Sequence, residues 1–453
     1  MPAPRPIIIV TGANSGVGFG ICHRLLVQLS QTAPPDAEPQ FKSLRPGKAT
    51  QDTAPTESYD GLTLIMACRS QKRAEVAREK LSKLLDEHIE VEKARPGYDG
   101  HAERFKKNLE INIHIVDMSV MKTVFSFCNE LSSRYPYISH LICNAGGAFW
   151  SGIDWLAAIH AIMSRGLIWA ITLPPYKLQH TGKMSVDGLG ATWQGNLFGH
   201  YTMYRHLRPM FAAYAERFNE PARMIWMSSL EGQPRWYNHD DWQLVKTDHS
   251  YEASKYQIDL ISSRLAQQSK EPGGEGAVVQ HFLVHPGIVH SNMTNGMINF
   301  FFDMCKVMFF YIARFLGSPN HTITPYESAV SATHIALVSI LAIPTSLLSF
   351  AHRRSKSKPC PSLWDDSLAT MSLYDTGIQS AKAARSAEKA GLYVPLKFSS
   401  ETDRHGRDYV GATPVLDWEG HEKESIYLVD KCDRLYQTFA NLEKDRSSNG
   451  SAC

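Results

Sequence analysis

The chain has 453 residues, of which 43% are hydrophobic and 20% are charged, and its formal net charge is +2. This composition supplies ample material for a globular core and excludes general disorder, and the small net charge gives no support for a nucleic-acid-binding surface. The eight cysteines are scattered without Cys-x-x-Cys spacing, so we expect reduced thiols facing the cytosol, with neither a disulfide framework nor a metal site.

Short apolar runs recur along the chain with helix-length segments between them. This alternation predicts an α/β fold of Rossmann type, a doubly wound parallel sheet with helices on both faces. The N-terminal residues lack the features of a signal peptide and lead into the first run, which we expect to be the first strand. The expected strands are residues 7–10, 62–67, 111–116, 140–143, 224–227 and 278–284.

We expect residues 1–453 to form a single enlarged domain, because α/β domains with insertions run long. The first insertion is rich in Pro, Gln, Thr and Asp, which predicts a mobile surface segment. The third contains an apolar stretch, and the last is basic and rich in Ser and Pro. The expected insertions are about 30–60, 86–110, 150–185 and 352–362.

A glycine-rich turn follows the first expected strand. Its TG-x-x-x-G-x-G pattern places Gly12, Gly16 and Gly18 where glycines allow a tight turn and close approach of a pyrophosphate to a helix N-terminus. An isolated glycine triplet is equally typical of an ordinary strand-to-helix turn, but its position after the first strand favours a dinucleotide. Other expected contacts in the turn are Asn14, Ser15 and Val17.

The ends of the next strands favour NADPH over NADH. Where a site for NAD usually has an acidic residue, this chain has Arg69 and Ser70, which suit a ribose 2′-phosphate. Arg69 could equally be a solvated residue at a helix start. Asp117 follows the third strand and is a candidate acceptor for the adenine amino group. Asn144 begins a stretch of small residues after the fourth strand, where a cofactor could lie close to the backbone.

The chain contains three Tyr-x-x-x-Lys spacings, and only one has a suitable context. Tyr251 and Lys255 follow an apolar run that ends in Ser228 and Ser229. The second match, at 393 and 397, encloses a proline that breaks a helix, and the third, at 427 and 431, lies near the C-terminus without a preceding Ser-bearing strand. A lysine four residues along a helix lies on the same face as the tyrosine, and its ammonium favours the phenolate. We therefore expect Lys255 to lower the pKa of Tyr251.

These motifs resemble the short-chain dehydrogenase/reductase superfamily, and they occur in the order typical of that superfamily across residues 7–292. A narrower similarity, in NLFGHY, SSLEGQPRWYNHDDW, HPGIVHSNM, ITPYES and DRHGRDYVG, is to the 3-ketosteroid reductases of sterol C4 demethylation. The chain departs from most of the superfamily in the 22 positions that separate Ser229 from Tyr251 and in the large first insertion.

The resemblance implies a role for each motif residue in ketone reduction. Tyr251 is the expected proton donor, and Lys255 tunes it and holds the nicotinamide ribose. Ser229, the second serine of its pair, is expected to bind the substrate oxygen. Asn196 is expected to position a water in a proton relay to the lysine. Expected cofactor contacts beyond the P-G turn are Val289 at the nicotinamide amide and Ser291 at a phosphate.

Apolar segments predict a lipid-like substrate. In the stretch after residue 295, Asp303, Lys306 and Arg314 fall on one narrow face of a helix and the rest of its circumference is apolar. Residues 335–351 form an uncharged run at the lower limit for crossing a bilayer, followed by Arg353 and Arg354. Each segment alone could be a core helix. Together, over about 295–351, they favour a lid over an apolar ligand and peripheral contact with a membrane surface.

The resemblance implies an NADPH-dependent reductase of the C3 ketone of 4-methylated or C4-demethylated sterol intermediates. It also implies residence at the cytosolic face of the endoplasmic reticulum membrane, extending to lipid droplets, with the other C4 demethylation enzymes as partners. Two alternatives stay open. One is a reductase of another lipid carbonyl, such as a 17-ketosteroid or retinal. The other is a non-catalytic, cofactor-binding scaffold of a membrane enzyme complex.

Overall fold

The computed structural model describes residues 5–41, 59–271, 273–291, 300–344, 346 and 393–450. Its centre is an eight-stranded sheet in the order β10-β9-β8-β7-β4-β1-β2-β3. All neighbouring strands are parallel except β10, which is antiparallel to β9. The strands are β1 (Ile7–Thr11), β2 (Leu62–Cys68), β3 (Leu109–Ile115), β4 (His140–Cys143), β7 (Ala222–Met227), β8 (Val279–His285), β9 (Leu396–Thr402) and β10 (Asp408–Pro414).

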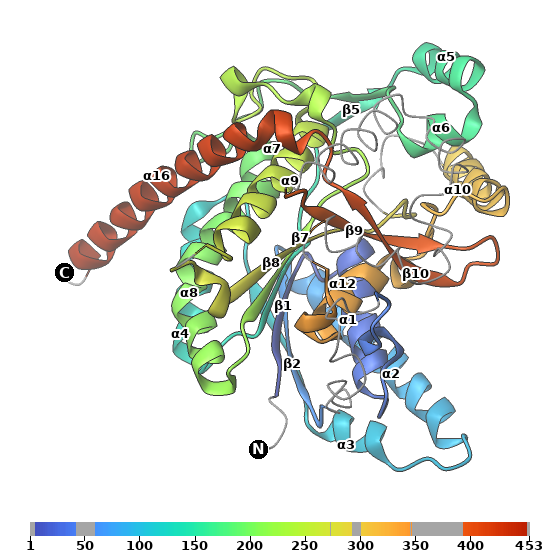
Figure 1. The fold of residues 1–453 in the computed structure, drawn as a ribbon, viewed down its shortest axis with the longest axis vertical. Coiled ribbons are helices and arrows are strands. Elements are labelled where there is room, and N and C mark those ends of the chain that lie inside the picture. Colours follow the sequence, from blue (N-terminus) through green and yellow to red (C-terminus); the bar gives the residue numbers. More distant parts are fainter. Residues whose placement is uncertain are drawn as a thin grey trace.

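Helices cover both faces of this sheet (Figure 1). Alternate residues of β1 enter two different cores: Ile7 and Ile9 pack with one set of helices, and Ile8 and Val10 with the other. The predicted doubly wound fold is therefore confirmed. One face carries α1 (Gly16–Leu29), α2 (Gln71–Lys93), α3 (His101–Lys107) and α12 (Val330–Leu337), and the other carries α4 (Met121–Arg134), α8 (Gly199–Phe218), α9 (Ser250–Gln268) and the long α16 (Trp418–Gly450).

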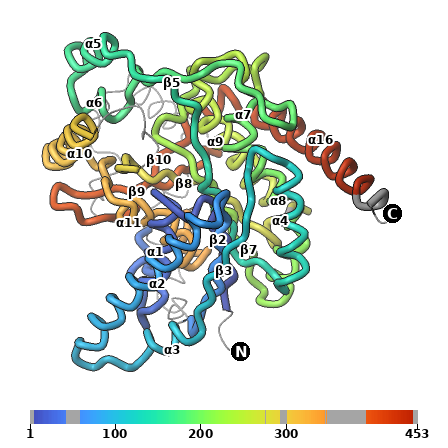
Figure 2. The backbone as a smooth tube through the Cα atoms, turned by 180° about the vertical axis from the view of Figure 1, so that it is seen from behind, coloured from blue at the N-terminus to red at the C-terminus, as the bar shows by residue number. Residues whose placement is uncertain are grey.

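A small subdomain stands apart from the sheet. An antiparallel pair, β5 (Trp150–Ile153) and β6 (Lys177–Gln179), brackets two helices, α5 (Trp155–Arg165) and α6 (Leu167–Thr172). In Figures 1 and 2 these helices lie at one end of the molecule together with α10 (Phe300–Phe315). The ring of Trp155 lies 5.0 Å from that of Phe302, which joins α5 to α10.

Several expected insertions contain ordered elements. The 86–110 stretch is the end of α2, then α3, and the start of β3. The first insertion is expected to be a mobile surface segment, yet in its described part the segment η1 (Pro35–Ala37) is packed and Asp36 is 2% exposed. Residues 38–40 are exposed, as expected for a surface segment, whereas Asp36, Ala37 and Phe41 are buried, and Asp36 is the partner of a buried arginine. Residues 42–58 and 352–362 lie outside the described ranges.

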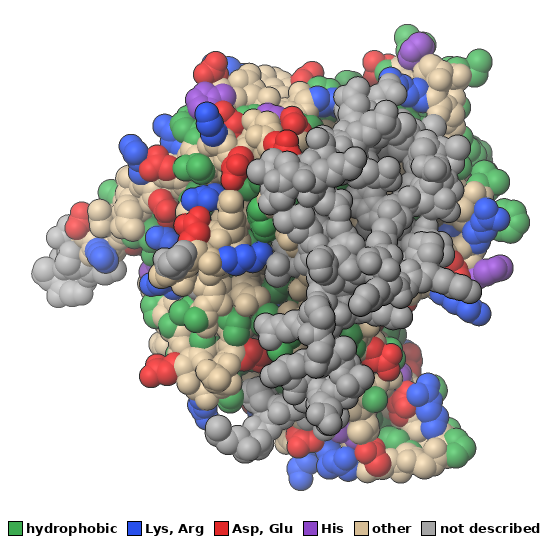
Figure 3. Space-filling model, in the orientation of Figure 1, with side chains coloured by type: hydrophobic (Ala, Val, Ile, Leu, Met, Phe, Trp, Pro, Cys, Tyr) green, Lys and Arg blue, Asp and Glu red, His purple; other side chains and the backbone are tan. Residues whose placement is uncertain are grey.

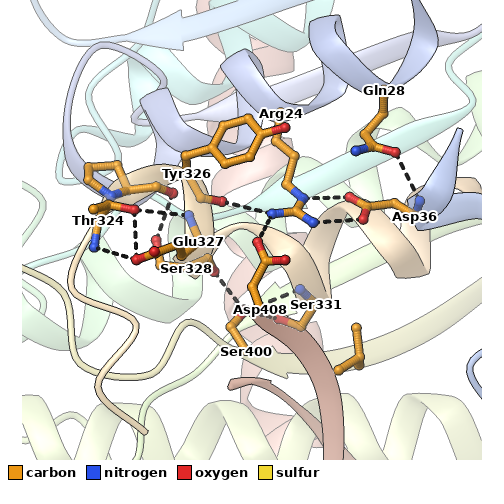
Figure 4. Close-up of polar contacts among 12 residues, drawn as sticks. Arg24, Gln28, Asp36, Thr324, Tyr326, Glu327, Ser328, Ser331, Ser400 and Asp408 are labelled. Atoms are coloured by element: carbon orange, nitrogen blue, oxygen red, sulfur yellow. Dashed lines mark hydrogen bonds and ion pairs between the residues drawn. The ribbon is translucent and has the colours of Figure 1, made fainter. Parts of the chain in front are cut away.

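The buried arginine is Arg24 on α1, and we call its cluster the Arg24 clamp (Figure 4). Its guanidinium donates to both carboxylate oxygens of Asp36, at 2.5 and 2.7 Å, and forms a second ion pair with Asp408 on β10. It also donates to the carbonyl of Tyr326 on α11 (Pro325–Ser328), and the His334 ring donates to the Asp36 carbonyl. The clamp therefore ties α1 to segments about 300 and 380 residues away.

The apolar run expected at residues 335–351 differs in part from its prediction. Every residue of α12 is buried, so the start of the expected 335–351 run belongs to the core rather than to a lid or membrane surface. Residues 345 and 347–351, like Arg353 and Arg354, lie outside the described ranges, as do residues 292–299. Within those ranges, no helix has both the length and the apolarity needed to cross a membrane.

The remaining short elements are α7 (Ala191–Trp193), the π-helical η2 (Gln194–Phe198), η3 (Pro234–Trp236), η4 (His239–Asp241), η5 (Glu275–Ala277) and η7 (Ile340–Ala342).

Candidate active site

The glycine-rich turn joins β1 to α1 at the carboxyl edge of the sheet. Gly12 and Gly16 have φ values of +67° and +52°, and a Cβ at Gly18 would overlap the Gly12 carbonyl oxygen. Ser15 is the N-cap of α1, and its side chain makes no capping hydrogen bond. The helix N-terminus and this hydroxyl therefore suit a phosphate group. The same turn holds the predicted residues Asn14 and Val17.

Arg69 and Ser70 follow β2, and Asp117 follows β3. The Arg69 side chain is 69% exposed, and its guanidinium lies 4.0 Å from the Asp117 carboxylate. Ser70 caps α2 by accepting a hydrogen bond from the Arg73 backbone. Asp117 accepts hydrogen bonds from the backbone and hydroxyl of Ser119. The guanidinium is thus open to a ligand phosphate, whereas Asp117 already orders its own turn.

Thr11, at the end of β1, is a hub that the sequence analysis does not single out. Its hydroxyl accepts hydrogen bonds from the backbone of Asn144 and of Ala145, both at 2.9 Å. The Asn144 side chain donates to the Thr11 carbonyl. The His200 ring lies 2.9 Å from the same hydroxyl and bonds the Asn196 carbonyl through its other nitrogen. This chain of contacts fixes the predicted cofactor edge to the helix that carries Asn196.

Asn196 lies in η2, a single π-helical turn at the start of α8. Such turns are rare within α-helices and occur frequently at functional sites. The Asn196 amide pairs with both backbone groups of Gly147, at 2.8 and 2.9 Å, and donates to the Ser254 hydroxyl. The widened turn thus aims the amide between the loop after β4 and helix α9.

Tyr251 and Lys255 lie one turn apart on α9, and both side chains are buried. The Lys255 ammonium lies 5.7 Å from the centre of the Tyr251 ring and donates to the Met227 carbonyl at 2.8 Å. A Cβ at Gly146 would stand 2.9 Å from the Asn196 amide oxygen and 3.7 Å from the Lys255 nitrogen. Asn196 and Lys255 therefore flank the same loop residue.

The two serines after β7 have different surroundings. The Ser229 hydroxyl accepts from the Glu231 backbone at 3.1 Å and lies near enough to the phenol of Tyr251 to act on its pKa. The Ser228 hydroxyl instead donates to the Lys255 carbonyl. Ser229 is thus the serine that the structure brings to the tyrosine, despite the 22 positions between them.

The expected lowering of the Tyr251 pKa is wrong for this structure. Burial raises the pKa of the phenol well above its usual value, and the Glu231 carboxylate raises it further, while the hydrogen bond with Ser229 opposes both. Burial lowers the pKa of Lys255 to about 8. Spacing along the helix predicts the contact between the two groups, but the burial that dominates their charges cannot be read from spacing.

The hairpin β5–β6 covers Tyr251 from outside the sheet. The Trp150 ring lies 5.6 Å from the Tyr251 ring, and the Lys177 ammonium lies 5.9 Å from the centre of that ring. Lys177 donates to both carboxylate oxygens of Glu231, at 2.6 and 2.7 Å, and the Gln179 side chain accepts from the Tyr251 backbone. The hairpin, which precedes Tyr251 by about 70 to 100 residues, thus encloses the tyrosine in polar and aromatic groups.

The turn after β8 reaches the glycine-rich loop. A Cβ at Gly16 would stand 3.5 Å from the Ser291 side chain, so Ser291 lies where the phosphate contact is expected. Val289 pairs with Ile323 in an isolated bridge, which holds this turn against the segment before α11. The predicted residues therefore gather along one edge of the sheet, with Arg69 and Asp117 at the ends of β2 and β3 and the catalytic candidates beyond β4.

A scan against models of known protein families finds no match. The chain is similar to a 3-keto-steroid reductase of Eremothecium gossypii, with 34% identity over 258 residues that cover 56% of this chain and 69% of the relative. The chain belongs to the 3-keto-steroid reductase family. It is also similar to a 3-keto-steroid reductase of Schizosaccharomyces pombe, with 28% identity over 360 residues that cover 78% and 90% of the two chains.

Among solved structures, salutaridine reductase of Papaver somniferum shares 16% identity with the chain at a TM-score of 0.41, covering 74% of this chain and 96% of that one. The family that the sequence motifs indicate is confirmed by the curated relatives, and so is an oxidoreductase acting on carbonyl or hydroxyl groups.

The sequence motifs do not include five residues that the structure brings to this site. They are Thr11, Lys177, Glu231, Asp259 and Lys397. Thr11 directly precedes Gly12, and Glu231 lies two positions after Ser229, so proximity to the motifs is the one sequence signal that could have indicated them. No comparable signal exists for Lys177 or Lys397.

Proposed function

We propose that the protein is an NADPH-dependent reductase that converts the C3 ketone of 4-methylated or C4-demethylated sterol intermediates to the 3β-hydroxyl during sterol biosynthesis. Family membership supports the ketosteroid substrate class. The observation that carries the proposal is the placement of Ser229 beside a buried Tyr251, with Lys255 one turn along the same helix, at the edge that carries the glycine turn.

The raised pKa of Tyr251 suits reduction. Burial and the Glu231 carboxylate keep the phenol protonated across the physiological range, and the protonated phenol is the form that can give a proton to a developing alkoxide. Ser229, beside the same phenol, is placed to donate a second hydrogen bond to the ketone oxygen. When bound, NADPH supplies the hydride. Lys255 would hold its ribose, and Asn196 fixes the loop beside Lys255.

The residues at the carboxyl edge fit NADPH. The positive-φ glycines and the free Ser15 hydroxyl leave room and donors for the pyrophosphate, and Ser291 lies against the same turn. The exposed Arg69 guanidinium would bind the 2′-phosphate that distinguishes NADPH from NADH. Replacing Arg69 with Ala should raise the KM for NADPH about tenfold or more and leave that for NADH nearly unchanged.

The decisive experiment is turnover of a 4-methyl-3-ketosterol by the purified full chain with NADPH, with the product identified as the 3β-alcohol. Tyr251→Phe should lower kcat about 100- to 10,000-fold, because it removes the proton donor. Tyr256→Phe is the matched control: it removes a buried phenol on the same helix that bonds the Leu416 carbonyl, and should retain kcat.

Each alternative has its own outcome. Faster turnover of a 17-ketosteroid or of retinal than of any 3-ketosterol would reassign the substrate. A well-folded protein that binds NADPH but reduces none of them, and whose cellular role survives Tyr251→Phe, would be the scaffold.

The proposed substrate is membrane-soluble, and α10 is built to rest on a membrane. Its three charged residues point toward the protein: Asp303 pairs with Lys306 and with His290, and Arg314 pairs with Glu327. Many of its apolar side chains point outward: Phe300, Phe301 and Phe315, with Leu316 directly after the helix, are all at least 58% exposed, although Phe310 and Ala313 are buried. This reverses the usual amphipathic arrangement, in which the polar face of a surface helix is the solvated one.

Helix α5 extends the same surface. Leu156 and Met163 are more than 80% exposed, and in Figure 3 hydrophobic side chains gather along the margin where α5 and α10 lie. Because α5 directly follows β5, the apolar surface adjoins the hairpin that covers Tyr251. We place this surface on the cytosolic leaflet of the endoplasmic reticulum membrane, where a sterol could reach the site.

Flotation with liposomes of phosphatidylcholine and anionic lipid tests this placement. Phe301→Ser/Phe315→Ser should lower the bound fraction at least tenfold. Val76→Ser/Val91→Ser removes two exposed apolar side chains from α2 and should not change it. Equal binding by both variants would remove the membrane from the proposal and leave the reductase in place.

A further inference from the structure

A second lysine lies beneath the active site. Lys397 is the lysine of the Tyr-x-x-x-Lys match at 393 and 397. It lies in strand β9 rather than in a helix. Its ammonium forms an ion pair with Asp259, and both side chains are buried, at 6% and 0% exposed. Asp259 follows Tyr251 and Lys255 at the same four-residue spacing on α9, so the three lie along one side of the helix.

The ion pair packs directly against the turn that carries Ser229. The Lys397 ammonium donates to the Ser229 carbonyl at 3.3 Å, and the same carbonyl accepts from the Gly232 backbone. A Cβ at Gly232 would stand 3.3 Å from the Asp259 carboxylate, so glycine leaves the space that the carboxylate fills. Ser229 is therefore held from below by Lys397 and its counter-ion.

The pair also sets the field at Lys255. The groups that act on Lys255 are Asp259 on its own helix, Lys397 on β9 and Cys143 on β4, and Lys255 in turn acts on His200 on α8. Asp259 raises the pKa of Lys255 and Lys397 lowers it. Removing one partner of the pair therefore shifts the charge balance of Lys255 in one direction, and removing the other shifts it in the opposite direction.

We propose that Lys397, held by Asp259, is a positioning residue of the reductase site, which fixes the backbone of Ser229 and balances the charge environment of Lys255. The inference rests on the proposed reductase function. It assigns Lys397 no contact with substrate or cofactor. Stability alone does not account for the pair, since well-packed apolar side chains can replace a buried ion pair at little or no cost.

The test compares Lys397→Met, Asp259→Asn and the double variant Lys397→Met/Asp259→Leu, in ketosteroid reduction and in NADPH binding followed by fluorescence, each across pH. Wild-type activity should fall as Lys255 loses its proton near pH 8. Lys397→Met should move this basic limb up by about one pH unit, and Asp259→Asn should move it down by about one. The double variant should restore its position.

The kcat values of the variants separate the positioning of Ser229 by Lys397 from the effect of Lys397 on the charge of Lys255. Lys397→Met and the double variant should both lower kcat about 10- to 100-fold with little change in KM, because Ser229 loses its anchor. Arg24→Met is the control for a lost buried cation: it should destabilise the protein without moving the basic limb.

The inference would be overturned if the basic limb of the pH profile shifted in the same direction in both single variants, or shifted in neither. Full kcat in the double variant would also overturn it. A wild-type protein that neither binds NADPH nor reduces a ketosteroid would instead refute the proposed function.

Discussion

The Arg24 clamp and the cluster of Asp259, Lys255 and Lys397 near Ser229 have opposite ratios of cations to carboxylates. In the clamp one guanidinium contacts two carboxylates, Asp36 and Asp408. Below the active site one carboxylate, Asp259, serves two lysines but contacts only Lys397, which leaves Lys255 with the Met227 carbonyl as its hydrogen-bond acceptor among the described residues. The clamp uses its charges to join distant segments, whereas the Lys255 ammonium of the site makes no ion pair within the described part of the chain.

The largest expected effect is on the clamp. Arg24→Met should lower the free energy of unfolding by about 3–5 kcal/mol, because it leaves two carboxylates without their cation, one of them buried. Urea unfolding of the full chain measures this loss. The turnover of the remaining folded protein should be unchanged. A loss below about 1 kcal/mol, or a specific fall in kcat, would end the distinction between a clamp for structure and a site for chemistry.

A pH dependence should appear in both regions through one buried histidine each. Burial lowers the pKa of His334, at the clamp, and of His200, at the site, to about 4. Between pH 4 and 6.5 the unfolded chain binds more protons than the folded chain, so stability falls as the pH falls through this window.

Each of these histidines should lower the free energy of unfolding by about 3 kcal/mol at pH 4 relative to pH 7. Urea midpoints measured from pH 7 to 4 should fall less steeply in His334→Gln and in His200→Gln than in the wild type. Parallel curves for the wild type and both variants would show that neither ring is held neutral.

A smaller effect is expected from the glycine that seats α1 on α11. A Cβ at Gly20 would overlap the Pro325 carbonyl, so Gly20→Ala should cost about 2 kcal/mol of stability by forcing the helices beside the clamp apart. The melting temperature should fall and kcat per folded molecule should not. Wild-type stability in this variant would mean that α11 moves freely against α1.

The smallest effect on stability, and a specific one on chemistry, is expected at the matching glycine of the site. Gly232→Ala brings a Cβ to 3.2–3.3 Å from the α9 backbone and the Asp259 carboxylate, which should cost about 1 kcal/mol. Because this turn carries Ser229, kcat should fall while KM is retained. A stability loss without a kcat loss would place the turn outside the machinery.

The sheet could be predicted where strands are buried on both faces, because such strands are continuous apolar runs, as in β1 and β2. Strand β9 escaped prediction for the opposite reason. Its sequence LKFSSET is mostly polar, yet all seven residues are buried. Lys397 pairs with Asp259, Ser400 bonds the Ser328 carbonyl and Thr402 bonds the His321 carbonyl. Tertiary partners satisfy these groups, and periodicity contains no trace of them.

The site divides in the same way. Tyr251, Lys255 and the glycine turn are local patterns, so the sequence predicts them and the structure brings them to one edge. Lys177 and Lys397 arrive from strands far along the chain. The protonation of Tyr251 depends on burial and on Glu231, and both are properties of the folded surroundings rather than of spacing.

Helix α10, with its charges turned inward and its phenylalanines turned out, has a kinetic consequence. An enzyme seated on a membrane as proposed would meet its sterol by lateral diffusion within a leaflet, while the nucleotide would arrive from water. Its velocity would then follow the mole fraction of sterol in the lipid rather than the bulk concentration, and diluting the sterol with inert phospholipid at constant total amount would slow it.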